Sequence, residues 1–158
     1  MNPAAIIPTM ALASIGASAL TAAERASELQ AGEAALKVAH RGHRKMRAQH
    51  WKALADVANV AEALAELRIA RNLMPQIQAA HAALADVISQ QQATGRWECT
   101  PPQLAALDEL LWIYGVQISH CSHRELYTAK ERVREVIRQA LAGNAAPGTV
   151  IHEVRRPL

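Results

Sequence analysis

The supply of hydrophobic side chains constrains the fold of this chain more than any other feature, because it is rich in alanine and poor in aromatic rings. Of the 158 residues, 51% are hydrophobic, but only three are Trp, two are Tyr and none is Phe. Alanine is the strongest helix former, whereas strands favour aromatic and β-branched residues. The composition therefore predicts an all-α fold. Because alanine buries little area, the helices must approach one another closely or assemble with partners.

The first 23 residues carry no charged side chain. This run is long enough to cross a bilayer, but proline, glycine and hydroxyl residues dilute its hydrophobicity. Small residues lie four positions apart at Ala13 and Ala17, a spacing that lets helices pack closely. We expect residues 1–30 to form an Ala-rich apolar helix that packs on the rest of the protein. The alternative is that residues 1–23 insert into a membrane.

A long helical pattern follows this apolar start. A heptad count from Leu36 to Met74 describes one amphipathic face, with steps that alternate between three and four residues. Gly32 and Gly42 are the points at which such a helix could break or bend. Pro75 marks a boundary, because the residue before a proline is pushed out of the α region. We expect residues 31–92 to form a long basic helix and a return helix, joined as an antiparallel hairpin.

A second hairpin is predicted over residues 100–143. Capping boxes begin at Thr100 and Ser122, and each is followed by an apolar stripe with helical spacing. A glycine stops the second of these helices. Agreement between caps and stripes predicts a compact unit, with Leu111 and Val133 in its core.

Residues 144–158 complete the predicted architecture. Between residues 149 and 154 the polarity alternates as it does in a strand, which predicts a short extended C-terminal tail. The chain is therefore expected to be all-α, with four to five helices: one long amphipathic helix, helical hairpins and this tail.

The strongest functional signal is a basic stretch between Lys37 and Lys52. It holds six Lys or Arg side chains and three His, and no acidic residue occurs between Glu33 and Asp56. On a continuous helix these cations would form an exposed stripe that attracts phosphate or an acidic protein surface. Trp51 would offer a ring that stacks on a base or a ligand cation. The candidate residues for binding a partner or nucleic acid are Lys37, Arg41, Arg44, Lys45, Arg47, Trp51 and Lys52.

The alternative for this stretch is a solvated helix face that keeps an Ala-rich protein soluble, with Trp51 in the core. The sequence contains no helix-turn-helix, zinc-finger or RNP signature, so sequence-specific reading of DNA is not expected.

Catalytic and metal-binding patterns are weak in this sequence. The grouping of Cys99, His120, Cys121 and His123 lacks the paired spacing of zinc ligands. Signatures of hydrolases, P-loop proteins, dinucleotide-binding folds and zinc proteases are absent. We therefore expect a protein that is not an enzyme and that uses no metal or cofactor.

Three short motifs give the chain a family likeness. They are the segment Thr94-Gly95-Arg96-Trp97, the stripe from Leu104 to Leu111, and Arg124-Glu125-Leu126. From about residue 49 to residue 158, the chain resembles uncharacterised small helical accessory proteins of proteobacterial phages, prophages and related mobile elements. The resemblance assigns no catalytic or binding residue. It implies a phage gene product that works inside a bacterium, in the host cytoplasm or in the virion.

These observations predict a non-catalytic phage or mobile-element protein that acts by surface contact, by binding or inhibiting a host protein or a nucleoprotein complex. The alternative is a structural or ejection component of the virion, whose N-terminal helix meets a membrane or is buried in an assembly. We expect a protein partner, with nucleic acid as a second partner of the basic helix. We also expect a homo-oligomer, built through the Val57–Leu67 face or the first helix.

Overall fold

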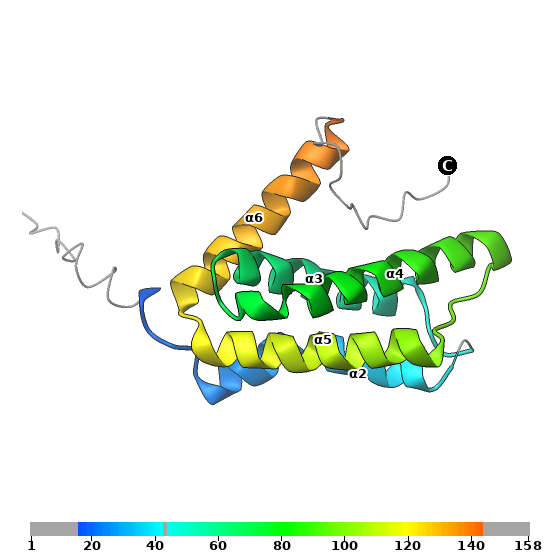
Figure 1. The fold of residues 1–158 in the computed structure, drawn as a ribbon, viewed down its shortest axis with the longest axis horizontal. Coiled ribbons are helices and arrows are strands. Elements are labelled where there is room, and N and C mark those ends of the chain that lie inside the picture. Colours follow the sequence, from blue (N-terminus) through cyan, green and yellow to red (C-terminus); the bar gives the residue numbers. More distant parts are fainter. Residues whose placement is uncertain (1–15, 43, 144–158) are drawn as a thin grey trace, which may run out of the picture.

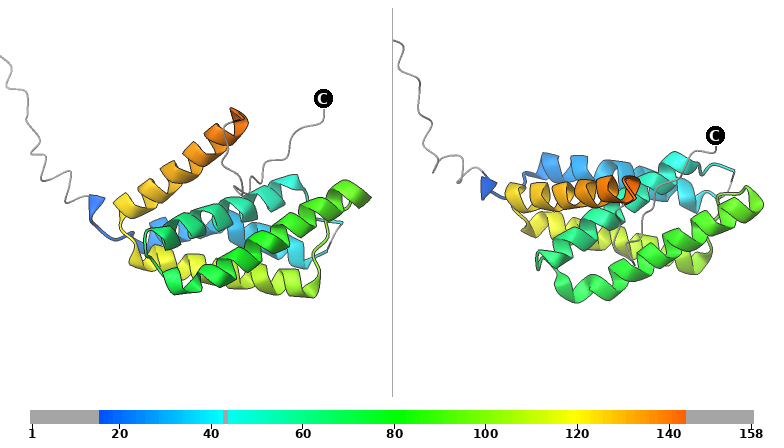
Figure 2. Two further views of the ribbon diagram at one scale, coloured as in Figure 1. Left: turned by 45° about the horizontal axis from the view of Figure 1, so that its top comes forward. Right: turned by 90° about the horizontal axis from the view of Figure 1, so that it is seen from above.

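The computed structural model describes residues 16–42 and 44–143, and this part of the chain forms five α-helices and one short 3-10 helix (Figure 1). The elements are α2 (Ala22–His40), α3 (Ala48–Glu66), η1 (Arg71–Leu73), α4 (Met74–Thr94), α5 (Pro101–His120) and α6 (His123–Leu141). The all-α prediction is confirmed. Helices α2, α3, α4 and α5 pack as a four-helix bundle, and α6 crosses α3 and then projects from the bundle (Figure 2).

Local sequence explains where the helices begin. The capping boxes predicted at Thr100 and Ser122 are both present, and Thr21 forms a third with Glu24 at the start of α2. Pro75 lies in the first turn of α4, where its missing N–H leaves no hydrogen bond unmade. Each cap satisfies backbone N–H groups that a helix start leaves without a partner.

Helix α3 lies at the centre of the molecule and contacts all four other helices. Half of its ten buried residues are alanine, so the neighbouring helices can approach it closely. Gly32 of α2 shows how close: an added Cβ would lie 2.9 Å from Cγ2 of Val57 and 3.0 Å from Cδ1 of Leu111. The apolar faces of α4 and α5 are buried here, and the most deeply buried residues include Ile77, Leu84, Val87, Leu107 and Ile118.

The continuous helix expected from the heptad count is interrupted. Helix α2 ends at His40, the chain turns at Gly42 with φ of 89°, and α3 begins at Ala48. The break predicted at Gly42 therefore occurs, and it places α2 beside α3 instead of in line with it. The two segments share one amphipathic period because both turn their apolar side toward the same core.

This break also removes the predicted surface for self-association. The Val57–Leu67 face, which was expected to meet a second copy, packs inside the bundle, where Val57, Val60 and Leu64 are buried. This face is therefore wrong as the predicted surface for self-association, whereas the expected homo-oligomer and its alternative contact through the first helix stay predictions. A heptad pattern records that a helix face is covered, and it does not record whether the cover comes from the same chain.

The compact hairpin expected at residues 100–143 does not form as predicted. Helix α5 is covered by α2, α3 and α4, so no side of its core face is left for α6. The extended residue Cys121 turns the chain, and α6 lies across α3 instead of along α5. Leu111 is buried as predicted, whereas Val133 is only partly buried at the edge of the core.

The structure tests the predictions for the two ends of the chain only in part. Residues 1–15 and the predicted tail at 144–158 lie outside the described residues. The helix expected over residues 1–30 is not continuous, since residues 17–21 are non-helical and Ala19 forms an isolated β-bridge with Ser122. Within the described ranges, none of the helices is long and apolar enough to cross a membrane.

A clamp of polar contacts fixes the start of α6 to the start of α2. The backbone N–H of His123 donates to the Ser18 carbonyl over 3.0 Å. The ring of His123 reaches the same carbonyl through Nδ1 and the Glu24 carboxylate through Nε2, each over 3.0 Å. Two turns further along α6, Lys130 donates to Glu28 over 2.6 Å. Both ring nitrogens of His123 therefore face acceptors, which favours the doubly protonated imidazolium.

The clamp is expected to make stability depend on pH in a definite direction. Hydrogen bonds to Glu24 and Ser18 raise the pKa of His123 above 6.5, so its contribution is present below pH 6.5 and is lost as the pH rises through the folded value. Hydrogen bonds from Thr21 and His123 lower the pKa of Glu24 from 4.5 to about 2, so its contribution is lost as the pH falls through that interval. We expect His123→Gln to lower the melting temperature more at pH 5.5 than at pH 8.5.

Thermal melts followed by circular dichroism measure this difference. His120→Gln is the matched control, because His120 is exposed at the end of α5 and contacts no described carboxylate. An effect of His123→Gln that is equal at both pH values would contradict the clamp.

Candidate interaction site between α2 and α5

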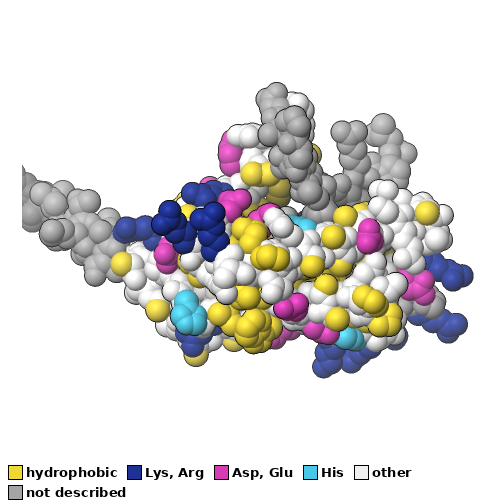
Figure 3. Space-filling view, viewed as in Figure 1, with side chains coloured by type: hydrophobic (Ala, Val, Ile, Leu, Met, Phe, Trp, Pro, Cys, Tyr) yellow, Lys and Arg dark blue, Asp and Glu magenta, His cyan; other side chains and the backbone are white. Residues whose placement is uncertain are grey.

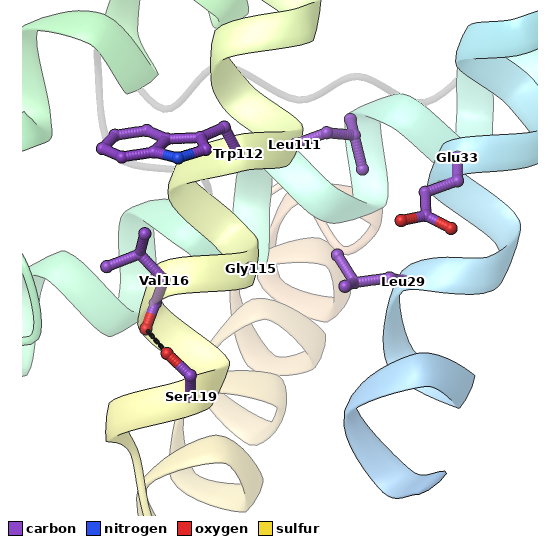
Figure 4. A pocket seen from close by; sticks show the side chains of 7 residues that line it. All are labelled: Leu29, Glu33, Leu111, Trp112, Gly115, Val116 and Ser119. Atoms are coloured by element: carbon purple, nitrogen blue, oxygen red, sulfur yellow. Dashed lines mark hydrogen bonds between the residues drawn. The ribbon is translucent and has the colours of Figure 1, made fainter. Parts of the chain in front are cut away.

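A groove runs along the seam between α2 and α5 (Figure 4). It has a volume of about 400 Å³ and opens to solvent. Leu29 and Glu33 line it from α2, and the lining residues of α5 are Leu111, Trp112, Gly115, Val116 and Ser119. Its surface is therefore mostly apolar, with a single carboxylate.

Gly115 forms the floor of this groove and has no role in internal packing that requires glycine. A glycine in a helix interior is less stable than alanine by about 0.5–1 kcal/mol. An added Cβ at Gly115 would meet only Cδ1 of Leu29, at an ordinary contact distance of 3.9 Å. At Gly32, by contrast, the neighbouring helices leave no room for a methyl group. Gly115 therefore leaves the α5 backbone open to an approaching group, at a cost that the monomer does not explain.

The two rims of the groove differ in chemistry. On the α5 side, Trp112 and Val116 line the groove with side chains that point away from α2 (Figure 4). Trp112 is 61% exposed. On the α2 side, the Glu33 carboxylate points toward the groove and makes no ion pair with any described residue. Exposed tryptophans are frequent anchors of protein interfaces, because they offer a large rigid surface. The arrangement fits an apolar side chain with a neighbouring cation.

The basic candidate residues do not share one helix stripe. Lys37 and Arg41 lie at the end of α2, Arg44 and Lys45 lie in the loop, and Arg47 and Lys52 lie at the start of α3. All six are exposed, and Figure 3 shows Lys and Arg side chains at the lower right, where this loop lies. The stripe on a continuous helix is therefore replaced by a basic cluster at one end of the bundle.

Two members of this basic cluster are engaged locally. Lys52 pairs with Asp56, one turn further along α3, over 2.8 Å. The guanidinium of Arg47 donates to the carbonyls of Arg44 and Met46 and so closes the turn before α3. The other four cations, Lys37, Arg41, Arg44 and Lys45, make no ion pair with the described residues.

Trp51 does not belong to any exposed site. Its side chain is 1% exposed, and its indole N–H donates to the Leu84 carbonyl over 2.9 Å. Its ring lies 6.2 Å from that of Trp97 in a tilted arrangement. The stacking role predicted for Trp51 is therefore wrong, and the alternative that placed it in the core is correct.

The two cysteines lie at opposite ends of α5. Cys99 lies beside Met46, with the two sulfur atoms 3.9 Å apart, whereas Cys121 is buried at the other end of α5. Burial raises the pKa of each thiol to about 11, which keeps both protonated at neutral pH. Across residues 16–42 and 44–143, no three His, Cys, Asp or Glu side chains gather in a way that could hold a metal ion.

Sequence reasoning missed the groove between α2 and α5. The available signal was Gly115, a glycine in the interior of a strong helical pattern, where glycine usually has a packing or functional reason. Trp112 follows Leu111 on the adjacent face, but the stripe alone does not show that α2 leaves this ring uncovered. Only the packing of α2 beside α5 brings these residues together with Glu33.

The contrast between the two helical glycines can be tested by alanine substitution. Gly115→Ala is expected to raise the free energy of unfolding by about 0.5–1 kcal/mol, because alanine is the better helix former and its methyl group fits. Gly32→Ala is expected to lower it, because overpacking costs about 1–3 kcal/mol and exceeds the gain in helix propensity. Urea denaturation measures both. Destabilisation by Gly115→Ala would show that internal packing does require glycine there.

Comparison with known proteins adds no further assignment to these observations. No family model, no curated protein and no solved structure matches the chain.

Proposed function

We propose that this protein is a non-catalytic interaction protein that binds a segment of a protein partner in the groove between α2 and α5. The resemblance of its motifs to phage and mobile-element accessory proteins supports a setting inside a bacterial host. Contact with a host protein, with inhibition as one consequence, is the role that fits this setting.

The observation that carries the proposal is the unexplained glycine at the floor of an apolar groove beside an exposed tryptophan. Gly115 gives up helix stability without a need from its neighbours in the same chain. Trp112 keeps a large apolar surface in water next to it. Both features are accounted for when a partner covers them, because its side chain then meets the α5 backbone and the indole together.

The lining of the groove favours binding over catalysis. Among its seven lining residues, Glu33 is the one ionisable side chain, and Ser119 donates its hydroxyl to the Val116 carbonyl over 2.7 Å. A nucleophile needs a neighbouring base within hydrogen-bond reach, and a general acid–base pair needs two titratable groups. Ser119 Oγ also lies 3.0 Å from Nδ1 of the neighbouring His120, but no carboxylate of the described chain contacts this exposed imidazole, and Glu33 has no second titratable group beside it in the lining.

Site-specific crosslinking in bacterial cells tests the proposal. A photo-crosslinking amino acid at Val116 is expected to capture a discrete protein, and nuclease treatment should leave that product unchanged. Gly115→Leu in the same chain should abolish capture and Gly115→Ala should weaken it, because each added side chain occupies the space at the α5 backbone that the partner is proposed to fill. The matched control is the same crosslinker at Arg71, which is exposed in η1. Products that are identical at both positions, or that persist in Gly115→Leu, would contradict the proposal.

A second candidate function is favoured by the basic cluster at the end of the bundle. The four cations Lys37, Arg41, Arg44 and Lys45 gather around one loop without ion-pair partners in the described chain. Such a cluster creates a positive potential that attracts nucleic acid or an acidic protein surface. Without Trp51 it offers charge alone, so any nucleic-acid binding by this cluster should be insensitive to sequence.

Charge reversal tests this second function. Arg44→Glu combined with Lys45→Glu is expected to weaken binding of a labelled single-stranded oligonucleotide at least tenfold, and added salt should weaken the unaltered protein in the same direction. Fluorescence anisotropy measures both effects. Arg68→Glu combined with Arg71→Glu is the matched control, because it reverses two exposed charges beyond the far end of α3. Equal losses in the two variants would show that net charge matters and the cluster does not.

A further inference from the structure

Helix α6 is attached to a bundle whose core is enclosed mainly by the other four α-helices. Two of its nineteen residues, Leu126 and Ala129, are buried, whereas α3 has ten buried residues and α5 has seven. Each of the other α-helices packs against at least two helical neighbours, but α6 packs extensively only against α3 (Figure 2). Apolar burial therefore contributes less to holding α6 in place than to holding any other helix.

The connection between α5 and α6 has the form of a hinge. The Cys121 N–H makes the last backbone hydrogen bond of α5, to the Gln117 carbonyl over 2.9 Å, and the backbone bonds of α6 start at Ser122. Cys121 and Ser122 are both extended, with ψ of 156° and 163°. Since each helix has its own cap at this point, α6 can rotate about these two residues without unwinding α5.

The polar clamp at the start of α6 holds this helix against the bundle. A β-bridge and the backbone bond from His123 to Ser18 tie its first turn to the residues that lead into α2. Further along, Lys130 pairs with Glu28 over 2.6 Å. Of the side chains in these contacts, only that of His123 ordinarily changes its charge near neutral pH.

The groups that face the His123 ring favour its charged form. Glu24 of α2 lies 3.0 Å from Nε2, and the Ser18 carbonyl and hydroxyl lie 3.0 Å and 3.1 Å from Nδ1. On α6 itself, Arg124 is turned toward Gly16, and the Glu125 carboxylate accepts from the Ser122 N–H. In the described part of α3, α4 and α5, no charged side chain forms a hydrogen bond with this ring.

Deprotonation weakens these contacts without removing all of them. The imidazolium donates to Glu24 and to the Ser18 carbonyl at once, whereas a neutral ring has one N–H. If that proton is on Nε2, the bond to Glu24 remains, but the Nδ1 lone pair faces the Ser18 carbonyl and has only the Ser18 hydroxyl as a donor. The protonated state is therefore the one in which the clamp is complete.

We propose that α6 is a hinged arm, which swings away at Cys121 and Ser122 while α2, α3, α4 and α5 stay folded, and which protonated His123 holds closed. This inference does not depend on the groove between α2 and α5. Opening uncovers Leu126, Ala129 and the side of α3 beneath them.

The population of the open form depends on pH with a definite sign. Hydrogen bonds to Glu24 and Ser18 raise the pKa of His123 above 6.5 in the closed form, so the closed form binds this proton more tightly than the open form. The open population is therefore lowest below pH 6.5 and rises as the pH climbs toward the closed-form value.

Hydrogen exchange of the full chain, followed by mass spectrometry of its peptides, tests whether α6 opens by itself. An isolated helix of this length is marginal in water, so the amides of α6 lose protection when it detaches. Val87→Ala removes a buried contact of α4 and is expected to lower the protection of α3 and α5 by about tenfold. The protection of α6 should stay unchanged in this variant, because the Val87 contacts remain intact in the open form.

The same measurement at pH 5.5 and pH 8.5 tests the role of His123. At each pH, the protection of α6 in the unaltered chain is compared with that in His123→Gln, which cancels the intrinsic dependence of exchange on pH. This ratio is expected to be about two- to fivefold larger at pH 5.5, the range that exposed ion pairs contribute. His120→Gln is the matched control and should give equal ratios at the two pH values.

Two results would overturn the inference. Equal loss of protection in α6 and α3 of Val87→Ala would show that α6 opens only when the bundle unfolds. A His123→Gln ratio that is the same at both pH values would show that protonation does not hold the arm. Circular dichroism shows that each variant is folded. The urea dependence of exchange in the unaltered chain provides a second measurement, because an opening of α6 alone exposes little surface and depends on urea more weakly than exchange in α3 does.

Discussion

The packing of small side chains around α3 is the constraint on which the rest of the structure depends. Five alanines are buried on this helix, and together with Val57, Val60, Leu54 and Leu64 they give it an apolar surface on most sides. Such a helix is stable only when neighbours cover it from several directions. Helices α2, α4, α5 and α6 supply that cover, and Gly32 lets α2 come close enough to do so. The close approach of the helices thus offsets the small buried area that results from having few large side chains.

Covering α3 on four sides determines what happens to α6. Because the core face of α5 is already covered by α2, α3 and α4, α6 reaches the core across α3, and only its first half makes that contact. Polar contacts secure the first turns, through His123 with Ser18 and Glu24 and through Lys130 with Glu28. The outer half extends beyond the core with its apolar face intact. An exposed face of this kind is a feature of interaction surfaces.

The two helical glycines separate internal packing from external contact. At Gly32 a methyl group would collide with two buried side chains, so the bundle itself requires glycine. At Gly115 a methyl group would touch one leucine at an ordinary distance, so the bundle does not. Internal packing therefore requires glycine at the first position and not at the second, and the difference comes from the side chains that neighbour each glycine. Gly115 therefore has no explanation in the packing of the described chain, and Trp112, three residues before it on α5, is exposed.

The sequence by itself determined the helical class, the helix starts and most of the inward faces, because these follow from local propensity, capping and periodicity. The boxes at Thr100 and Ser122 and the turn at Gly42 are of this kind. Only the tertiary structure decided which helix packs against each of these apolar faces. The periodicity of Val57 to Leu67 is the same whether α2 or a second copy lies against it, and the burial of Trp51 depends on Leu84, which is distant in sequence. The groove at Gly115 exists only because α2 packs beside α5, and a non-local contact of that kind leaves no trace in the local pattern.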